Sequence, residues 1–191
     1  MVQLPPSAPG RVLRSTPGQT IGPFFAFGLG FPKMNEIAAP HSPGSTILRG
    51  RVYDGDGAPV PDAMIEIFGA DRDGTIPGAR GSLNRDSHTF TGFGRVFTDD
   101  EGQWMFWTRE PGGNGRAARF FAVMLFARGL TDRLRTRIYL PGEGSGLDAD
   151  PLLVALNEQE RTTLIATRQP DGTLHHDLWL QGEKETVFLD C

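Results

Sequence analysis

Turn-forming residues divide the sequence after residue 45 into short runs of β-branched and aromatic residues. Asp54–Gly57, Asp99–Gly102 and Pro170–Gly172 each combine Asp or Pro with Gly, the residues that tight turns between strands favour. Such signals recur about every 8 to 12 residues, which is the spacing of an all-β sandwich or barrel. The pattern therefore predicts an all-β fold, a β-sandwich of roughly eight or nine short strands.

Residues 119–127 form a continuous apolar run after the initial Arg, which is typical of a buried strand in a sandwich core. Residues 161–168 are expected to be a strand of the last hairpin. Asp150 and Pro151 before residues 152–157 predict a short capped helix, because Asp accepts backbone N–H groups and Pro suits the first helical turn. A short helical turn is also expected around Lys33–Ala39.

The first 45 residues differ from the rest of the chain because they hold eight of its 15 prolines. Proline lacks a backbone N–H and fixes φ, so this density disfavours both long helices and central strands. We therefore expect residues 1–45 to be an extended N-terminal arm and residues 46–191 to be one β-sandwich domain, with one or two short helices in all.

Net charge, hydropathy and cysteine content argue against nucleic-acid binding, a membrane span and an oxidising compartment. The net charge is −4, so the chain carries no overall positive field for nucleic acid. The apolar stretch Phe24–Phe31 is interrupted by glycines and is far shorter than a membrane span, and no signal peptide pattern is visible. The single cysteine, Cys191, forms no intramolecular disulfide, so we expect a cytoplasmic protein.

Few residues could carry chemistry, since the chain has four His, two Tyr and one Cys, and no P-loop, zincin, nucleophile-elbow or Cys-x-x-Cys motif. His175 and His176 are adjacent on a predicted strand, which sends their rings to opposite faces and prevents one metal from binding both. His41 and His88 lie in loops and are expected to be exposed, and the roles of all four histidines stay open. Residues 133, 135 and 137 are arginines that would share one strand face, which is a solvated face, a subunit contact or an anion-attracting rim.

Three stretches together carry a resemblance to a known family. The first is Thr16–Phe25, with the sequence Thr-Pro-Gly-Gln-Thr-Ile-Gly-Pro-Phe-Phe; the second runs from Leu48 through Glu66 to Gly102; the third joins Leu125–Leu130, Thr136–Tyr139 and Gln181–Phe188. From about residue 14 to residue 190 the chain resembles the intradiol ring-cleavage dioxygenases, and it is most similar to the iron-free chain type of their two-chain members.

The resemblance implies a ferric ion held by two tyrosines and two histidines, a donor set whose phenolates suit the trivalent ion. The matching positions in this sequence are Ile76, Asn114, Phe120 and Ala122, none of which supplies those donors. The resemblance therefore implies that this chain binds no metal and has no activity alone. The Fe(3+) would belong to a homologous beta chain, paired with this chain in a higher (alpha-beta)n oligomer.

The family also implies which residues of this chain meet the substrate, a catechol that carries a carboxylate, which reacts with O₂. Thr20, Gly22 and Pro23 would line the pocket, and Arg128 would attract the carboxylate or else serve as a structural ion pair. Two alternatives stay open: a stand-alone β-sandwich that binds or scaffolds without catalysis, and a dioxygenase with relocated ligands, in which Tyr53, Tyr139, His175 and His176 would have to converge.

Overall fold

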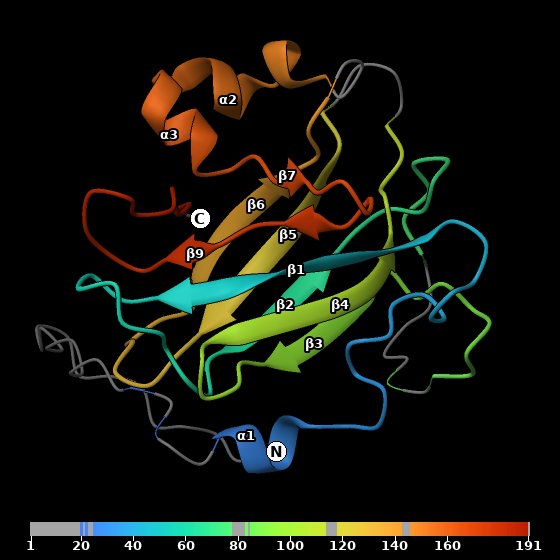
Figure 1. The fold of residues 1–191 in the computed structure, drawn as a ribbon, viewed down its shortest axis with the longest axis horizontal. Coiled ribbons are helices and arrows are strands. Elements are labelled where there is room, and N and C mark those ends of the chain that lie inside the picture. Colours follow the sequence, from blue (N-terminus) through green and yellow to red (C-terminus); the bar gives the residue numbers. More distant parts are fainter. Residues whose placement is uncertain are drawn as a thin grey trace, which may run out of the picture.

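The computed structural model describes residues 20, 22, 25–77, 83, 85–113, 118–142 and 146–190. Within these residues the chain forms two packed β-sheets, with short helices at opposite ends of the molecule (Figure 1). The predicted β-sandwich is therefore confirmed. None of the helices in the described part of the chain is long and apolar enough to cross a membrane.

The first sheet has the strand order β4-β1-β8-β7, with β9 also paired to β1. These strands are β1 (Ser45–Tyr53), β4 (Gln103–Arg109), β7 (Thr167–Arg168), β8 (Leu174–His175) and β9 (Leu178–Trp179). Strand β1 is antiparallel to β4 and parallel to both β8 and β9. Gly50 stands in the middle of β1 because a Cβ there would lie 1.7 Å from the backbone oxygen of His176.

The second sheet has the order β3-β2-β5-β6 and is antiparallel throughout. Its strands are β2 (Met64–Phe68), β3 (Phe93–Phe97), β5 (Phe120–Phe126) and β6 (Leu134–Tyr139). The inward-facing residues of both sheets form the main core, since alternate side chains of a strand point to one face. Its largest fully buried members are Phe106, Phe121, Ile37, Leu48, Ile65, Ile67, Leu125, Ile138 and Leu140.

Strand β5 corrects one expectation, because it is not buried on both faces. Phe121, Val123 and Leu125 are buried, whereas Ala122 and Met124 are exposed on the outer side of the sheet. A run that is apolar on both faces of a strand normally has both faces covered. The outer face of this sheet is therefore a surface that the described part of the chain leaves uncovered.

The helices differ in part from the expected ones. Helix α2 (Pro151–Ala155) is capped by Asp150, as predicted, and a 3-10 turn, η1 (Leu147–Ala149), precedes it. The strand expected over residues 161–168 is wrong for most of its length, because α3 (Glu158–Thr162) extends into it and only β7 is extended. The Asn157 and Glu160 side chains form a capping box that starts α3, a signal that is visible in the sequence.

The helical turn expected at Lys33–Ala39 is also absent from the described residues. The arm instead forms α1 (Phe25–Leu29), and residues 32–35 make a turn that leads to a bridge between Glu36 and Trp107. The backbone N–H groups of Ile37 and Ala38 donate to the Trp107 carbonyl, which ties this segment to the edge of β4. The division into an arm and a domain at residue 45 stays a prediction.

Candidate functional site

Three of the four positions matched to iron ligands lie around one hollow. Phe120 and Ala122 are two residues apart on β5, so their side chains point to the same outer face, and Ile76 approaches from the loop after β2. The hollow has a volume of about 240 Å³. Asn114 lies outside the described residues, although Gly113, its neighbour in sequence, lines the same hollow.

The described side chains at this hollow are unsuited to a ferric ion, because Ile76, Phe120 and Ala122 offer only hydrocarbon. A positive charge lies beside Phe120: the Arg137 guanidinium carbon is 4.2 Å from the centroid of the Phe120 ring, in a cation–π arrangement. The positive charge of Arg137 would repel a metal ion bound beside Phe120. The described positions that the resemblance matches to iron ligands thus carry hydrocarbon side chains, with a guanidinium stacked on one of them.

Arg137 is held there by a buried polar network. Its Nη1 donates a hydrogen bond of 3.0 Å to the Tyr139 hydroxyl and lies 3.8 Å from Oδ2 of Asp150. The Tyr139 hydroxyl in turn donates to Oδ1 of Asp150 at 2.9 Å. Burial raises the pKa of Tyr139 to about 12, so its phenol stays protonated at neutral pH. The network joins β6 to α2, which Asp150 caps.

The remaining tyrosine and the adjacent histidines do not converge on Tyr139. Tyr53 belongs to the other sheet, where its ring stacks on Trp179 with centroids 4.5 Å apart. His175 is partly exposed, with Nε2 3.5 Å from Oδ1 of Asp177, whereas His176 is buried. The relocated-ligand hypothesis therefore has no geometry to support it. Across the described ranges, no group of three or more His, Cys, Asp or Glu residues could hold a metal ion.

The histidine predictions agree with the structure where it tests them. His176 is buried and His175 is partly exposed, which agrees with one ring turned inward and one outward. His41 and His88 are exposed in loops, and the His41 ring contacts the Trp107 ring edge-on with centroids 4.7 Å apart.

The arm residues and Arg128 come together at the turn after β5. The Thr20 Oγ1 accepts a hydrogen bond of 3.2 Å from the Gly129 N–H and another of 3.4 Å from the Gly22 N–H. Gly22 has φ of +76°, a left-handed conformation that favours glycine. Thr20 and Arg128 are thus neighbours in space, while Pro23 lies outside the described residues, and the pocket-lining role of all these residues stays a prediction.

Arg128 makes a two-point contact with Asp62. Its Nη2 lies 2.7 Å from Oδ2 and its Nε donates to Oδ1 at 3.2 Å. Both side chains are more than a third exposed, so solvent screens this pair and its stabilising effect is small. The contact fixes the direction of the guanidinium plane at the protein surface.

The arm and the apolar hollow lie at opposite ends of β5. Phe120 begins the strand and Arg128 follows its end by two residues, which separates them by about 20 Å or more of extended chain. One bound substrate could not contact both places. Arg128 and Thr20 therefore do not belong to the apolar hollow of their own chain.

An exposed apolar face lies between these two ends, and the sequence analysis did not foresee it. The strand register puts Phe93, Phe68 and Ala122 in one row across the sheet, and Met124 in the next. Phe68 is 37% exposed and Met124 is 40% exposed. A groove of about 200 Å³ runs along these residues to Leu189. We call the surface formed by Phe68, Phe93, Ala122 and Met124 the apolar outer face.

Comparisons with known proteins agree with this geometry. A family model described as "Dioxygenase" matches residues 33–119. The protocatechuate 3,4-dioxygenase alpha chain of Burkholderia cepacia is 37% identical over 195 residues, which cover 93% of this chain and 98% of that one. The protocatechuate 3,4-dioxygenase beta chain of the same organism is 31% identical, over 66% of this chain and 57% of that one.

A solved structure is similar over most of the chain. The dioxygenase domain of a dioxygenase and carbohydrate-binding protein fusion from Streptomyces sp. SirexAA-E superposes with a TM-score of 0.59, at 24% identity, over 88% of this chain and 99% of that one. At that identity the likeness bears on the fold, and it supports the two-sheet sandwich.

The fold is the two-sheet β-sandwich that is also found in this dioxygenase domain. The described side chains at the positions matched to iron ligands are hydrocarbon. The chain belongs to the intradiol ring-cleavage dioxygenases, a family of iron-using oxidoreductases. This confirms the resemblance first seen in the arm motif and in the strands that follow it.

Proposed function

We propose that this chain is the alpha-type subunit of a protocatechuate 3,4-dioxygenase and that it pairs with a homologous beta chain which holds the iron. The complex would insert both atoms of O₂ between the two hydroxyl-bearing carbons of 3,4-dihydroxybenzoate and release 3-carboxy-cis,cis-muconate, a step in the breakdown of aromatic compounds. The observation that supports the proposal most is the hollow at Ile76, Phe120 and Ala122, which gathers three of the positions matched to the family's iron ligands and offers no tyrosine or histidine among its described side chains. The likeness to an alpha chain over nearly its whole length supports the same assignment.

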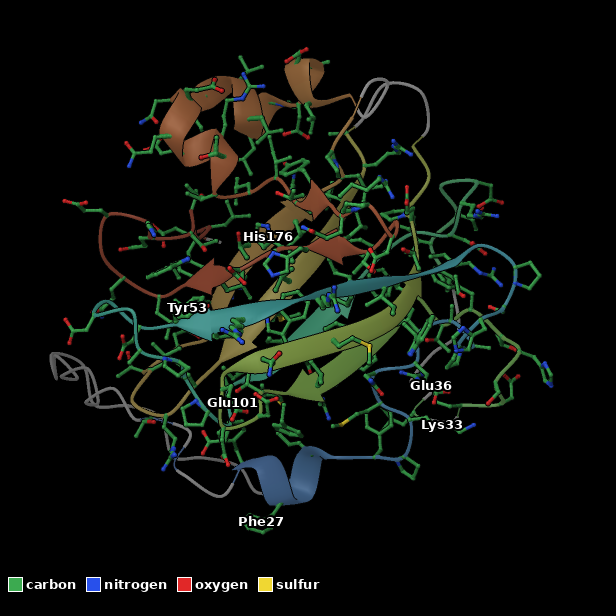
Figure 2. All side chains as sticks on the ribbon, viewed as in Figure 1. Phe27, Lys33, Glu36, Tyr53, Glu101 and His176 are labelled. Atoms are coloured by element: carbon green, nitrogen blue, oxygen red, sulfur yellow. The ribbon has the colours of Figure 1, made fainter. Side chains whose placement is uncertain are left out.

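The apolar outer face is the surface that we assign to the beta chain. Solvent-exposed Phe and Met side chains in adjacent strands are costly to leave in water, and such patches mark protein contacts. Arg135 and Arg137 border the patch, where polar residues commonly rim an apolar interface. Phe27 in helix α1 is a further exposed apolar side chain: it is 85% exposed and points away from the sandwich (Figure 2).

The arm and Arg128 would contribute to the partner's substrate pocket rather than to a pocket of their own chain. Their separation from the apolar hollow supports this, as does the exposure of Arg128. Because Nε and Nη2 of Arg128 hold Asp62, the Nη1 end of the guanidinium is the part that could meet a substrate carboxylate. Thr20, Gly22 and Pro23 would present backbone close to the ring, since glycine lets the backbone approach a ligand closely and proline restricts the conformation of the chain.

The test is to express the full chain alone and together with a beta chain, and to measure iron and protocatechuate cleavage. Alone, the chain should be colourless, free of stoichiometric iron and inactive. Coexpressed, it should copurify with the beta chain as a coloured ferric complex that consumes O₂. Stoichiometric iron and activity in the chain alone would refute the proposal.

A matched pair of substitutions tests the contact surface. Met124→Arg places a long charged side chain beside Arg135 in the apolar outer face and should weaken copurification with the beta chain, because a guanidinium buried at an interface has a high desolvation cost. Val154→Arg changes a residue that is 64% exposed on α2, away from this face, and should copurify normally. Equal copurification of the two variants, with unchanged melting temperatures, would exclude this face as the interface.

The stand-alone scaffold hypothesis has no observation in its favour. The whole-length likeness to a dioxygenase alpha chain favours the subunit assignment instead. If it were nevertheless a scaffold, the chain would fail to copurify with any beta chain while remaining folded.

A further inference from the structure

A second hollow lies where β1 begins and β4 ends, away from Thr20 and Arg128, and it shares no lining residue with the groove of the apolar outer face. Its volume is about 580 Å³, within the usual range of small-molecule sites. Arg72, Arg119, Ile47 and Trp107 line it together with the backbone around Gly44 and Gly172. Its lining side chains Arg72, Arg119, Ile47 and Trp107 take no part in the function proposed above, although Pro111 and Gly112 also border the hollow at Ile76.

Arg119 reaches the hollow without an acidic partner. The residue is partly buried, and its Nε is shielded from solvent and has no hydrogen-bond acceptor among the described groups. Within the part of the chain that the structure describes, no carboxylate lies within salt-bridge distance of its guanidinium. This Nε–H group is removed from water, and no described acceptor offsets its desolvation.

Arg72 supplies a second cation to the same hollow. Its guanidinium lies against the backbone of Gly44, so closely that a Cβ on Gly44 would be 2.3 Å from Cζ. Gly44 has φ of +76°, so glycine is favoured there for its conformation as well as its size. No ion pair of Arg72 is found in the described ranges, so Gly44 positions a guanidinium that has no acidic partner of its own.

The two acidic side chains at the hollow are already engaged elsewhere. Glu110 accepts a hydrogen bond of 2.7 Å from Nη1 of Arg168. Asp171 accepts the Thr173 N–H at 2.9 Å and lies 3.9 Å from Nη2 of Arg49. Two arginines are therefore left over at one hollow, in a chain whose net charge is −4. Such a local excess of positive charge attracts small anions.

We propose that this hollow is a binding site for a small planar organic carboxylate, whose carboxylate is held by Arg119 and Arg72 and whose carbon skeleton packs on Trp107 and Ile47. Guanidinium groups match a carboxylate through paired, parallel N–H donors. The apolar side chains on the lining favour a carboxylate with a flat apolar body over inorganic phosphate, which has none. The site does not depend on the proposed partner chain, so it stands or falls separately from the function above.

The experiment is a calorimetric titration of the full-length chain with benzoate, benzamide and inorganic phosphate. Benzoate should bind with one-to-one stoichiometry, and its affinity should fall as ionic strength rises, because salt screens the attraction. Benzamide has the same shape without the charge and should bind at least tenfold more weakly, as should phosphate. Arg119→Gln should weaken benzoate binding at least tenfold, and Arg72→Gln should weaken it less, because Arg72 is exposed.

Two further variants separate binding from folding. Arg133→Gln removes an exposed arginine outside this hollow and should leave benzoate affinity unchanged. Arg119→Lys keeps the charge without the planar fork and should retain part of the affinity with an unchanged melting temperature. Absence of saturation by ~20 mM benzoate would overturn the proposal, since that is weaker than ordinary millimolar binding. Equal binding of benzamide, tighter binding of phosphate, or an unaffected and folded Arg119→Gln variant would each overturn it too.

Discussion

Acidification from pH 7 to pH 5 should destabilise the fold through His176. This side chain is 5% exposed and lies beside β1 where β8 leads into β9 (Figure 2). One ring nitrogen bonds the backbone of Ile165, while Nε2 has no partner among the described groups. Burial is the main cause that lowers the pKa of His176 from 6.5 to about 4, and the neighbouring His175 adds a smaller repulsion. The folded protein therefore keeps this imidazole neutral.

The sign of the effect follows from proton binding in the two states. Between pH 6.5 and pH 4 the unfolded chain protonates His176 and the folded chain does not, so unfolding takes up a proton. The contribution is absent above about pH 6.5 and grows as the pH falls. At 1.36 kcal/mol for each pKa unit, the full loss is about 3 kcal/mol near pH 4, and about 2 kcal/mol is lost by pH 5.

The assay is urea unfolding at several pH values between 7.5 and 4.5, in the wild-type chain and in His176→Gln. Glutamine can donate to the Ile165 carbonyl but does not titrate, so the variant should lose about 2 kcal/mol less than wild type between pH 7 and pH 5. His88→Gln, at an exposed loop position, should follow the wild-type curve. Parallel pH profiles for wild type and His176→Gln would show that the buried imidazole does not control acid stability.

Further predictions concern positions where the structure allows little change, each measured as the free energy of unfolding in urea. Gly50→Ala should cost at least ~3 kcal/mol, because the added Cβ would overlap the His176 carbonyl and force β1 away from β8. The control Gly28→Ala, in α1, adds a Cβ that meets no atom within 4 Å, and it should be neutral or slightly stabilising. Asp150→Ala should cost about 2 to 3 kcal/mol, since it removes both the α2 cap and the acceptor of the buried Tyr139 hydroxyl. A change below ~1 kcal/mol in Asp150→Ala would contradict the structural role assigned to this network.

Local features of the chain were predictable because they depend on neighbours in sequence. The turns at Asp54–Gly57 and Asp99–Gly102 and the Asp150 cap need only the chemistry of adjacent residues, and the structure has them. The capping box of α3 was equally local, yet the β-rich pattern around it favoured a strand and the prediction was wrong. The family resemblance likewise rested on contiguous motifs, and the comparisons confirm it.

Other features depended on which segments the fold brings together. Period and composition describe Met124 and Leu125 as equally apolar, and only the packing of two sheets decides that Leu125 is buried while Met124 faces outward. The surplus of positive charge at Arg72 and Arg119 arises because five separate segments meet at one end of the sandwich.

The sequence by itself determined the strand-rich sandwich and the family, because residue identity, local turn chemistry and contiguous motifs are enough for these. It also determined that Ile76, Phe120 and Ala122, the positions that the resemblance matches to iron ligands, carry hydrocarbon side chains. Only the tertiary structure decided that those three positions share one hollow beneath Arg137, that the arm lies at the far end of β5, and that an apolar face is left uncovered. The physical reason is that burial and charge pairing are properties of long-range contacts, which residues distant in sequence acquire only when the two sheets pack.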